Sequence, residues 1–176
     1  MNKQLIIIPI VIFSLILLTF FYLLSIERNP SNIPSNLLEK KVPNFESESL
    51  LKNYIFDSSK EFNDEITLVN FFATWCKPCK EEHVYIKRFA KEEKIRVIGI
   101  NYKDSTKKTI KWLGDLGNPY SNVLLDKNGR IAIDWGVYGI PETFIVSSEG
   151  IIKYRHAGPI TKKIYKKINK IIMEID

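Results

Sequence analysis

Two cysteines, Cys76 and Cys79, are the residues whose type and spacing most clearly suggest chemistry in this chain. They lie in the stretch NFFATWCKPCKEEH, after an apolar run at 66–73 that predicts a buried strand and at the start of a helical pattern at 77–93. Free amide groups at a helix N-terminus, together with Lys77, favour ionisation of Cys76. Cys79 would point toward the core and react second. The pair is therefore typical of dithiol–disulfide exchange.

Two other interpretations of the cysteine pair are open. A purely structural disulfide would close so short a loop that it hardly constrains the unfolded chain, so stabilisation is a poor reason for it. A zinc site could use both cysteines together with His83 and His156, the two histidines of the chain. However, His83 lies one helical turn after Cys79, whereas zinc ligands usually come from separate elements. We therefore expect no metal and no cofactor.

Strands and helices alternate around the cysteines. The last helix would expose its lysines and bury a stripe made of Ile160, Ile164, Ile168 and Ile171. The elements predicted after the first helix are a strand at 96–101, a helix at 105–117, a hairpin with strands at 142–147 and 151–157, and a helix at 160–174. This order, with a Cys-x-x-Cys turn between a strand and a helix, predicts an α/β thioredoxin-like fold with a mixed central sheet flanked by helices.

An uncharged segment, Leu5 to Leu24, precedes this domain. As a helix rising ~1.5 Å per residue, it would cover the ~30 Å hydrocarbon core of a membrane. A cleaved signal peptide would have a shorter apolar core and a small-residue cleavage site, which LSIERNP does not offer. We therefore expect an uncleaved N-terminal transmembrane helix as a membrane anchor at 1–26, a tether at 27–41 and the thioredoxin-like domain at 42–176. The charges that flank the helix do not decide its orientation.

The net charge of +6 does not point to a particular partner. The basic residues do not gather into one stripe, and they do not alternate with aromatic residues as a base-stacking platform would require. The lysines of 160–174 fit the solvent-exposed face of a helix. We expect no nucleic-acid partner.

Four stretches carry a resemblance to a known family: IPSNLLEKKVPNF, LVNFFATWCKPCKEEH, GVYGIPETF and GIIKYRHAG. With the anchor, they make the chain similar to the DsbE/CcmG family, the membrane-anchored thioredoxin-like proteins of cytochrome c maturation. The resemblance implies a redox-active disulfide between Cys76 and Cys79. It also implies a cis peptide bond between Ile140 and Pro141 that lies against the cysteines, with the Ile140 backbone pairing with an incoming peptide as an added strand.

Two aromatic residues are candidates for contact with a substrate. Trp75 would offer a flat surface beside the cysteines, and Tyr138 would line the adjoining groove together with Trp135. With Ile140, Trp75 and Tyr138 form the predicted substrate-binding set.

Cys79 needs a proton acceptor before it can attack a disulfide. Thioredoxins keep a buried aspartate on the strand before the cysteines, but the matching residue here is Asn70. The resemblance implies that Glu82 and Glu142, which match acidic residues of the family, take this role. The predicted catalytic set is therefore Cys76, Cys79, Pro141, Glu82 and Glu142.

The resemblance also implies a cellular role. The domain would lie on the periplasmic side of a bacterial inner (cytoplasmic) membrane and act as a protein-disulfide reductase. Its substrates would be disulfides in the Cys-x-x-Cys-His haem sites of apocytochrome c, or a mixed disulfide with a haem-ligation component, and a membrane donor of the DsbD or CcdA type would supply electrons. The alternative within the same chemistry is a general membrane-anchored thiol-disulfide reductase resembling ResA or TlpA. A membrane-tethered module whose thiols hold a metal or a partner is an alternative of another class.

Overall fold

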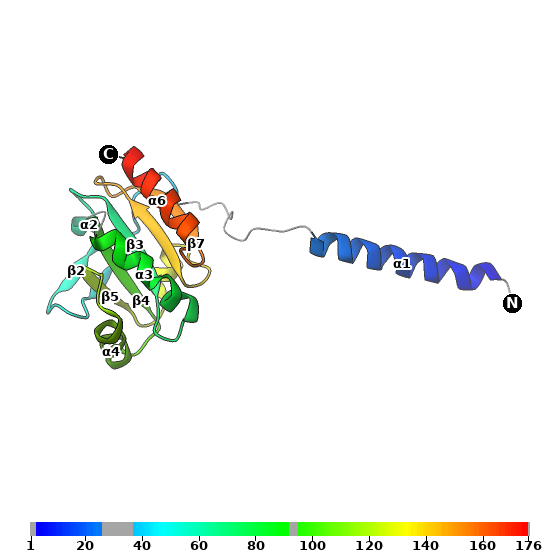
Figure 1. Cartoon of the computed structure of the whole chain (residues 1–176), viewed down its shortest axis with the longest axis horizontal. Helices are drawn as coiled ribbons and strands as arrows, with labels where there is room; N and C mark the ends of the chain where they lie inside the picture. Colours follow the sequence, from blue (N-terminus) through cyan, green and yellow to red (C-terminus); the bar gives the residue numbers. More distant parts are fainter. Residues whose placement is uncertain (1–2, 26–36, 92–94, 176) are drawn as a thin grey trace. The chain divides into compact units, whose positions relative to one another are not determined.

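The computed structural model describes residues 3–25, 37–91 and 95–175. The chain divides into two compact units, Met1–Asn32 and Ile33–Asp176, which are coloured along the sequence in Figure 1. The predicted tether lies mostly outside the described residues, because residues 26–36 are not among them.

Helix α1 (Lys3–Ser25) makes up the described part of the first unit. Its segment Ile7–Ser25 is long enough to cross a membrane and has a mean hydropathy of 2.8. Two of its hydroxyl groups are satisfied within the helix: Thr19 Oγ1 donates to the Leu15 carbonyl oxygen at 2.7 Å, and Ser25 Oγ donates to the Phe21 carbonyl oxygen at 2.8 Å. A helix that pairs its own polar groups and carries an apolar surface fits a single-pass membrane anchor.

The second unit is built on a mixed five-stranded sheet with the strand order β5-β4-β3-β6-β7. Strands β3, β4 and β5 run parallel, whereas β6 is antiparallel to both β3 and β7. Its elements are β1 (Glu46–Glu48), β2 (Ile55–Asp57), α2 (Ser58–Glu61), β3 (Thr67–Phe72), α3 (Lys77–Lys91), β4 (Arg96–Tyr102), α4 (Thr106–Leu116), β5 (Asn122–Asp126), α5 (Arg130–Asp134), β6 (Glu142–Val146), β7 (Ile152–Ala157) and α6 (Lys162–Ile175). The predicted thioredoxin-like fold class is confirmed.

Strand β3 is buried along its whole length because both faces of the sheet are covered. On one face, Leu68 and Phe72 join a core that includes Phe89 of α3 and Ile168 of α6, and Figure 1 shows these two helices in front of the sheet. On the other face, Val69 and its neighbours pack around the fully buried Trp135. A strand buried on both faces reads as a continuous apolar run, which is why it could be predicted.

Several short elements were not predicted, namely β1, β2, α2, β5 and α5. Strand β5 has the sequence NVLLD, which is too short for a period of two to be distinguished from a helical turn. The N-terminal boundary of the domain also differs. The Glu39 amide donates to the Ile152 carbonyl at 2.9 Å and Lys41 bridges to Ile151, so residues 37–41 pack on the domain rather than forming tether.

The core-facing stripe of α6 is rotated relative to the predicted one. Tyr165, Ile168 and Ile172 are buried, whereas Ile164 and Ile171 are only partly buried. An α-helix has 3.6 residues per turn, so residues at repeated steps of four drift around its surface. Steps that alternate between three and four, as from Tyr165 to Ile168 to Ile172, keep the same face toward the core.

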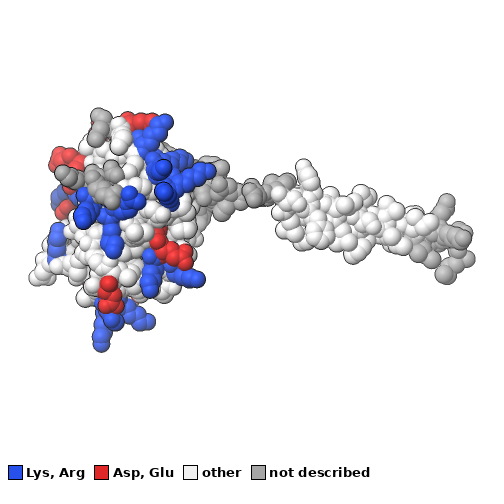
Figure 2. Space-filling view, viewed as in Figure 1, with Lys and Arg blue, Asp and Glu red and all other residues white. Residues whose placement is uncertain are grey.

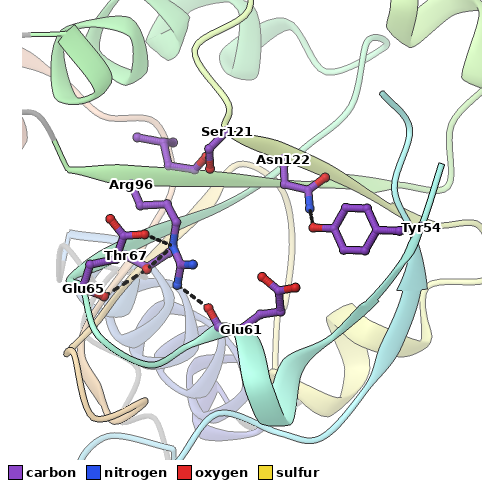
Figure 3. Close-up of polar contacts among 8 residues, drawn as sticks. Tyr54, Glu61, Glu65, Thr67, Arg96, Ser121 and Asn122 are labelled. Atoms are coloured by element: carbon purple, nitrogen blue, oxygen red, sulfur yellow. Dashed lines mark hydrogen bonds and ion pairs between the residues drawn. The ribbon is translucent and has the colours of Figure 1, made fainter. Parts of the chain in front are cut away.

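Polar side chains fasten the smaller elements to the sheet at the end where β4 begins. Arg96 Nε donates to Thr67 Oγ1 at 2.9 Å, and its Nη2 donates to the Glu61 carbonyl, which joins β4 to β3 and α2 (Figure 3). Asn122 Nδ2 donates to the Tyr54 hydroxyl, which ties the chain before β2 to β5. Because the cysteines follow the other end of the parallel strand β3, this network stabilises the fold at a distance from them.

Charges on the surface are mixed. Lysine and arginine side chains are spread over the face of the domain seen in Figure 2, with aspartates and glutamates between them. Exposed pairs such as Lys111–Asp115 and Lys127–Glu48, with N–O distances of 2.9 and 2.7 Å, bring opposite charges together.

Candidate active site

The two cysteines lie at the junction of β3 and α3. The chain turns after β3, with the Cys76 amide donating to the Ala73 carbonyl at 3.2 Å, and α3 begins at the next residue, Lys77. Cys76 and Cys79 form a disulfide with an Sγ–Sγ distance of 2.03 Å. The Cys79 amide lies 3.2 Å from Cys76 Sγ and points at it, so an N–H group of the first helical turn is available to a thiolate there once the disulfide is reduced.

Both sulfurs are well covered by protein. The exposed fraction is 5% for Cys76 and 2% for Cys79. Both cysteines are therefore buried, and Cys76 is slightly the more exposed of the two. A buried second thiol will give up its proton reluctantly, because burial disfavours the charged form.

The segment before β6 lies directly against the disulfide. The Ile140–Pro141 peptide bond is cis, and Cys76 Sγ lies 3.7 Å from the Ile140 carbonyl oxygen. Pro141 is buried and Ile140 is partly buried. The structure thus brings together the cysteines and the proline segment, which are more than sixty residues apart in the sequence.

Two exposed aromatic side chains come from the loops that adjoin the disulfide. Trp75 is 60% exposed, and its Nε1 donates to the Lys103 carbonyl at 3.3 Å. Tyr138 is 69% exposed, and the Arg155 guanidinium lies 4.8 Å from its ring centroid. Trp135, by contrast, is fully buried in the core and does not line a groove.

Glu82 lies one turn beyond Cys79 on α3 and is only 1% exposed. Its carboxylate accepts hydrogen bonds from Asn70 Nδ2 and from the Ile160 amide, both at 2.8 Å. Burial outweighs these bonds and raises the pKa of Glu82 to about 7. A carboxyl group with this pKa can exchange a proton near neutral pH, which is the property a proton acceptor for Cys79 requires.

The amide of Asn70 is itself held in place. The Tyr120 hydroxyl donates to Asn70 Oδ1 at 2.9 Å, so the Nδ2 group is directed toward Glu82 and Thr143. The Tyr120 ring lies against Gly99 of β4, where an added Cβ would be 2.9 Å from the ring. The same Cβ would be 2.8 Å from the Phe72 ring, so a larger residue at position 99 would displace one of these two aromatic rings.

Replacing Glu82 with glutamine tests its elevated pKa. Folding raises the pKa of Glu82 from 4.5 to about 7, so the contribution of Glu82 to stability is fully present below pH 4.5 and is lost as the pH rises through 7. The loss is roughly 3 kcal/mol. Urea denaturation at pH 4.5 and pH 8 measures this effect. The unfolding free energy of Glu82→Gln, relative to that of the wild type, should be higher at pH 8 than at pH 4.5 by about this amount. The exposed neighbour provides the control, since Glu81→Gln should follow the wild-type pH dependence; parallel curves for Glu82→Gln and wild type would contradict the assignment.

Glu142 is fully buried and ion-paired with Arg155, whose side chain is 6% exposed. Arg155 Nη2 also donates to the Gly136 carbonyl at 3.0 Å, and the Tyr138 amide donates to the Glu142 carboxylate at 3.2 Å. Burial raises the pKa of Glu142, whereas Arg155 and the backbone donors act in the opposite direction. Glu142 thus differs from Glu82 in being tied to a cation and to the loop before Pro141.

Arg155 was missed by sequence reasoning. In the β6–β7 hairpin it lies opposite Phe144, two residue pairs along the ladder from Glu142 and therefore on the same face of the sheet. The predicted strands at 142–147 and 151–157 would pair Glu142 with His156 and place Arg155 on the opposite face. The register shift between Ile145 and Val146 brings Arg155 onto the face of Glu142, so the sequence pattern contained no signal for this pair.

The two histidines contact carbonyl groups in different places. His83 Nε2 lies 2.8 Å from the Gly117 carbonyl oxygen, and burial lowers the pKa of its ring. His156 Nε2 lies 3.3 Å from the Pro159 carbonyl oxygen. Within the part of the chain that the structure describes, no three His, Cys, Asp or Glu side chains gather in a way that could hold a metal ion.

Comparison with known proteins places this site in context. The Redoxin family model matches residues 38–171. The thiol:disulfide interchange protein DsbE of Tatumella citrea is 42% identical over 172 residues, which cover 94% of this chain and 91% of that protein. DsbE of Escherichia coli K12 is 38% identical over 180 residues, covering 99% of this chain and 96% of that protein.

Solved structures share the fold. A secreted thiol-disulfide isomerase from Corynebacterium glutamicum superimposes with a TM-score of 0.71 at 18% identity, covering 86% of this chain and 94% of the other. A DsbF homologue from Corynebacterium diphtheriae gives a TM-score of 0.67 at 19% identity, covering 85% and 96%.

The fold and the cysteine pair define a thioredoxin-like thiol:disulfide oxidoreductase. Identity at this level extends over nearly the whole length of the DsbE proteins. The chain belongs to the DsbE/CcmG family of thiol:disulfide interchange proteins.

Proposed function

We propose that this chain reduces the disulfides of Cys-x-x-Cys-His haem sites in apocytochrome c, or a mixed disulfide with a haem-ligation component, during cytochrome c maturation. The observation that carries the proposal is the similarity to DsbE proteins over nearly the whole chain, which includes the anchor segment as well as the redox domain. Haem attaches to thiols, so an oxidised haem site must be reduced before it can accept haem.

The chemistry begins with Cys76. Its thiolate, stabilised by the N-terminal amides of α3, attacks one sulfur of the substrate disulfide and displaces the other as a thiolate, which takes up a proton. Ile140 lies beside Cys76 Sγ, and Trp75 and Tyr138 lie on the loops that adjoin the disulfide. We propose that all three contact the substrate, and that the Ile140 backbone and Pro141 align its peptide.

The second step releases the substrate. Cys79 loses its proton to Glu82 and attacks Cys76 Sγ, which re-forms the internal disulfide and expels the second substrate thiolate. Two electrons have then passed from the dithiol to the substrate. We propose that a membrane donor of the DsbD or CcdA type returns them. We propose that Glu142, unlike Glu82, does not accept a proton. Its ion pair with Arg155 and the hydrogen bond that it accepts from the Tyr138 amide hold the loop that leads to Pro141.

The role of Glu82 can be measured in the second step alone. In a mixed disulfide between Cys76 and thionitrobenzoate, release of the coloured thiol reports attack by Cys79. Glu82→Gln should slow this release at pH 7 by on the order of a hundredfold, since it removes the proton acceptor. The difference should shrink at high pH, where Cys79 ionises without help. Equal release rates for the wild type and Glu82→Gln at pH 7 would contradict the assignment.

We further propose that the domain lies on the periplasmic side of the inner membrane, with the amino terminus inside. Reduction of haem sites takes place where cytochromes c are assembled, and that requirement motivates this orientation. Alkaline phosphatase fused after residue 175 should be active, whereas a cytoplasm-dependent reporter at the same position should be inactive; the reverse pattern would exclude the orientation.

Complementation separates the proposed substrate from a general reductase of the ResA or TlpA kind. In a bacterium that lacks its own DsbE gene, this chain should restore holocytochrome c, as should an added small thiol, whereas the Cys76→Ser variant should not. Failure of the chain to restore holocytochrome c, combined with efficient reduction of unrelated protein disulfides in vitro, would favour the general reductase.

A further inference from the structure

The loop after β4 holds the loop that carries Cys76. The Thr74 amide donates to Asp104 Oδ2 at 2.5 Å, and Thr74 Oγ1 donates to Asp104 Oδ1 at 3.0 Å. Strands β3 and β4 are parallel, with Phe72 opposite Asn101, so the chain leaves both strands at the same edge of the sheet. One carboxylate therefore accepts two hydrogen bonds from the residue two positions before the nucleophile.

The Asp104 carboxylate is itself fixed by its own segment. Its oxygens also accept from the Ser105 amide at 2.7 Å and from Asn101 Nδ2 at 3.3 Å. Asn101 is buried, and the Thr109 hydroxyl of α4 donates to its Oδ1 at 3.0 Å. The residue at the N-cap of α4 is Ser105, so Asp104 is not explained as the cap of that helix.

A second contact runs between the same two loops. Trp75 Nε1 donates to the carbonyl of Lys103, the residue before Asp104. Thr74 and Trp75, the two residues immediately before Cys76, are thus both attached to residues 103–104. The position of Cys76 Sγ beside the Ile140 carbonyl depends on the path of this short turn.

We propose that Asp104 is a positioning residue that keeps Cys76 in place for attack by holding Thr74 through both the amide and the hydroxyl. The proposal rests on the proposed function in which Cys76 is the attacking thiol. Small displacements of a reacting atom reduce rates strongly, so loss of this support should appear in the reactivity of Cys76 as well as in stability.

Two variants separate positioning from charge. Asp104→Ala removes all the hydrogen bonds of the carboxylate. Asp104→Asn removes the charge and the acceptor of the Ser105 amide, but it keeps both contacts with Thr74, because its oxygen can accept from the Thr74 amide and its NH2 can donate to Thr74 Oγ1. Loss of a negative charge alone would lower the pKa of a nearby thiol and speed its reaction at neutral pH. Loss of positioning acts in the opposite direction, because Cys76 moves relative to the helix N-terminus.

The experiment is alkylation of the reduced full-length chain in detergent with a limiting amount of iodoacetamide, followed by mass spectrometry to locate the label. At pH 7 we expect the rate at Cys76 to fall about tenfold in Asp104→Ala and to stay within about 1.5-fold of wild type in Asp104→Asn. The matched control is Asp115→Ala, an exposed aspartate on α4 paired with Lys111, which should react like wild type. Thr74→Val, which loses the hydroxyl bond alone, should be slowed about threefold and decides the matter if Asp104→Ala does not fold.

The outcomes distinguish the two proposals. The positioning role would be overturned if Asp104→Ala reacts as fast as wild type or faster. It would also be overturned if Asp104→Asn reacts as slowly as Asp104→Ala. If Asp104→Ala does not fold, an unchanged rate in Thr74→Val would overturn it. If the wild-type chain is labelled first at Cys79, the proposed function fails instead, because Cys76 is then not the attacking thiol.

Discussion

Cys76→Ser will lose disulfide exchange, with a rate at least about a thousandfold below wild type, since a hydroxyl at neutral pH cannot replace a thiolate. Cys79→Ala will behave differently. It retains the attacking sulfur and the α3 amides, so it will react with a substrate disulfide once and stop at the mixed disulfide. Stopped-flow reduction of a Cys-x-x-Cys-His peptide disulfide would show no reaction for the first variant and a single turnover without release for the second.

The opposite assignment makes the opposite prediction. If Cys79 attacked first, Cys79→Ala would be inert and Cys76→Ser would form the stable mixed disulfide. The N–H group of the first helical turn points at Cys76 Sγ, where it can stabilise a thiolate, and this argues against that order.

Arg155→Ala is expected to lower the free energy of unfolding by about 3–5 kcal/mol, because it leaves the fully buried Glu142 carboxylate without its cation. The loss should be larger at pH 8 than at pH 5. Without Arg155, burial raises the pKa of Glu142 further, and stability is lost as the pH rises through the folded-state value. Urea denaturation at the two pH values measures both effects.

Matched variants make this prediction specific. Adding Glu142→Gln to Arg155→Ala removes the buried charge, so the double variant should recover part of the stability and keep only the pH dependence that is due to Glu82. Arg130→Ala removes an arginine that is 73% exposed and paired with Asp134, and it should change stability by less than about 1 kcal/mol. A pH-independent loss in Arg155→Ala would mean that the ion pair does not control the ionisation of Glu142.

Arg155→Ala should also slow disulfide exchange. The Arg155–Glu142 pair contacts the Gly136 carbonyl and the Tyr138 amide, and both belong to the loop that ends at Pro141 beside Cys76. Release of this loop would disturb one wall of the site while leaving the cysteines unchanged.

Local pattern was sufficient to predict the central part of the site. The apolar run of β3, the helical spacing of α3 and the Cys-x-x-Cys turn between them identify both cysteines and the end of the helix on which they lie. The proline segment required the family resemblance, because nothing in a local window shows that Ile140 lies 3.7 Å from Cys76.

The supporting contacts were out of reach of the sequence because they join distant residues. The oxygens of Glu82 are held by Asn70 and by Ile160, which is 78 positions away, and Asp104 reaches Thr74 across 30 positions. Such contacts depend on strand order and on where parallel strands end. The order was only partly predictable here, since β5 carries too short an apolar run.

The most direct measurement is capture of the natural partner by Cys79→Ala, expressed as the full-length anchored chain in a bacterium that makes cytochromes c. After acid quenching and alkylation, mass spectrometry should find Cys76 linked through a disulfide to the haem-site cysteine of an apocytochrome c or to a haem-ligation component, and Cys76→Ser should yield no adduct. Adducts spread over unrelated periplasmic proteins, or a link formed by any sulfur other than that of Cys76, would contradict the mechanism.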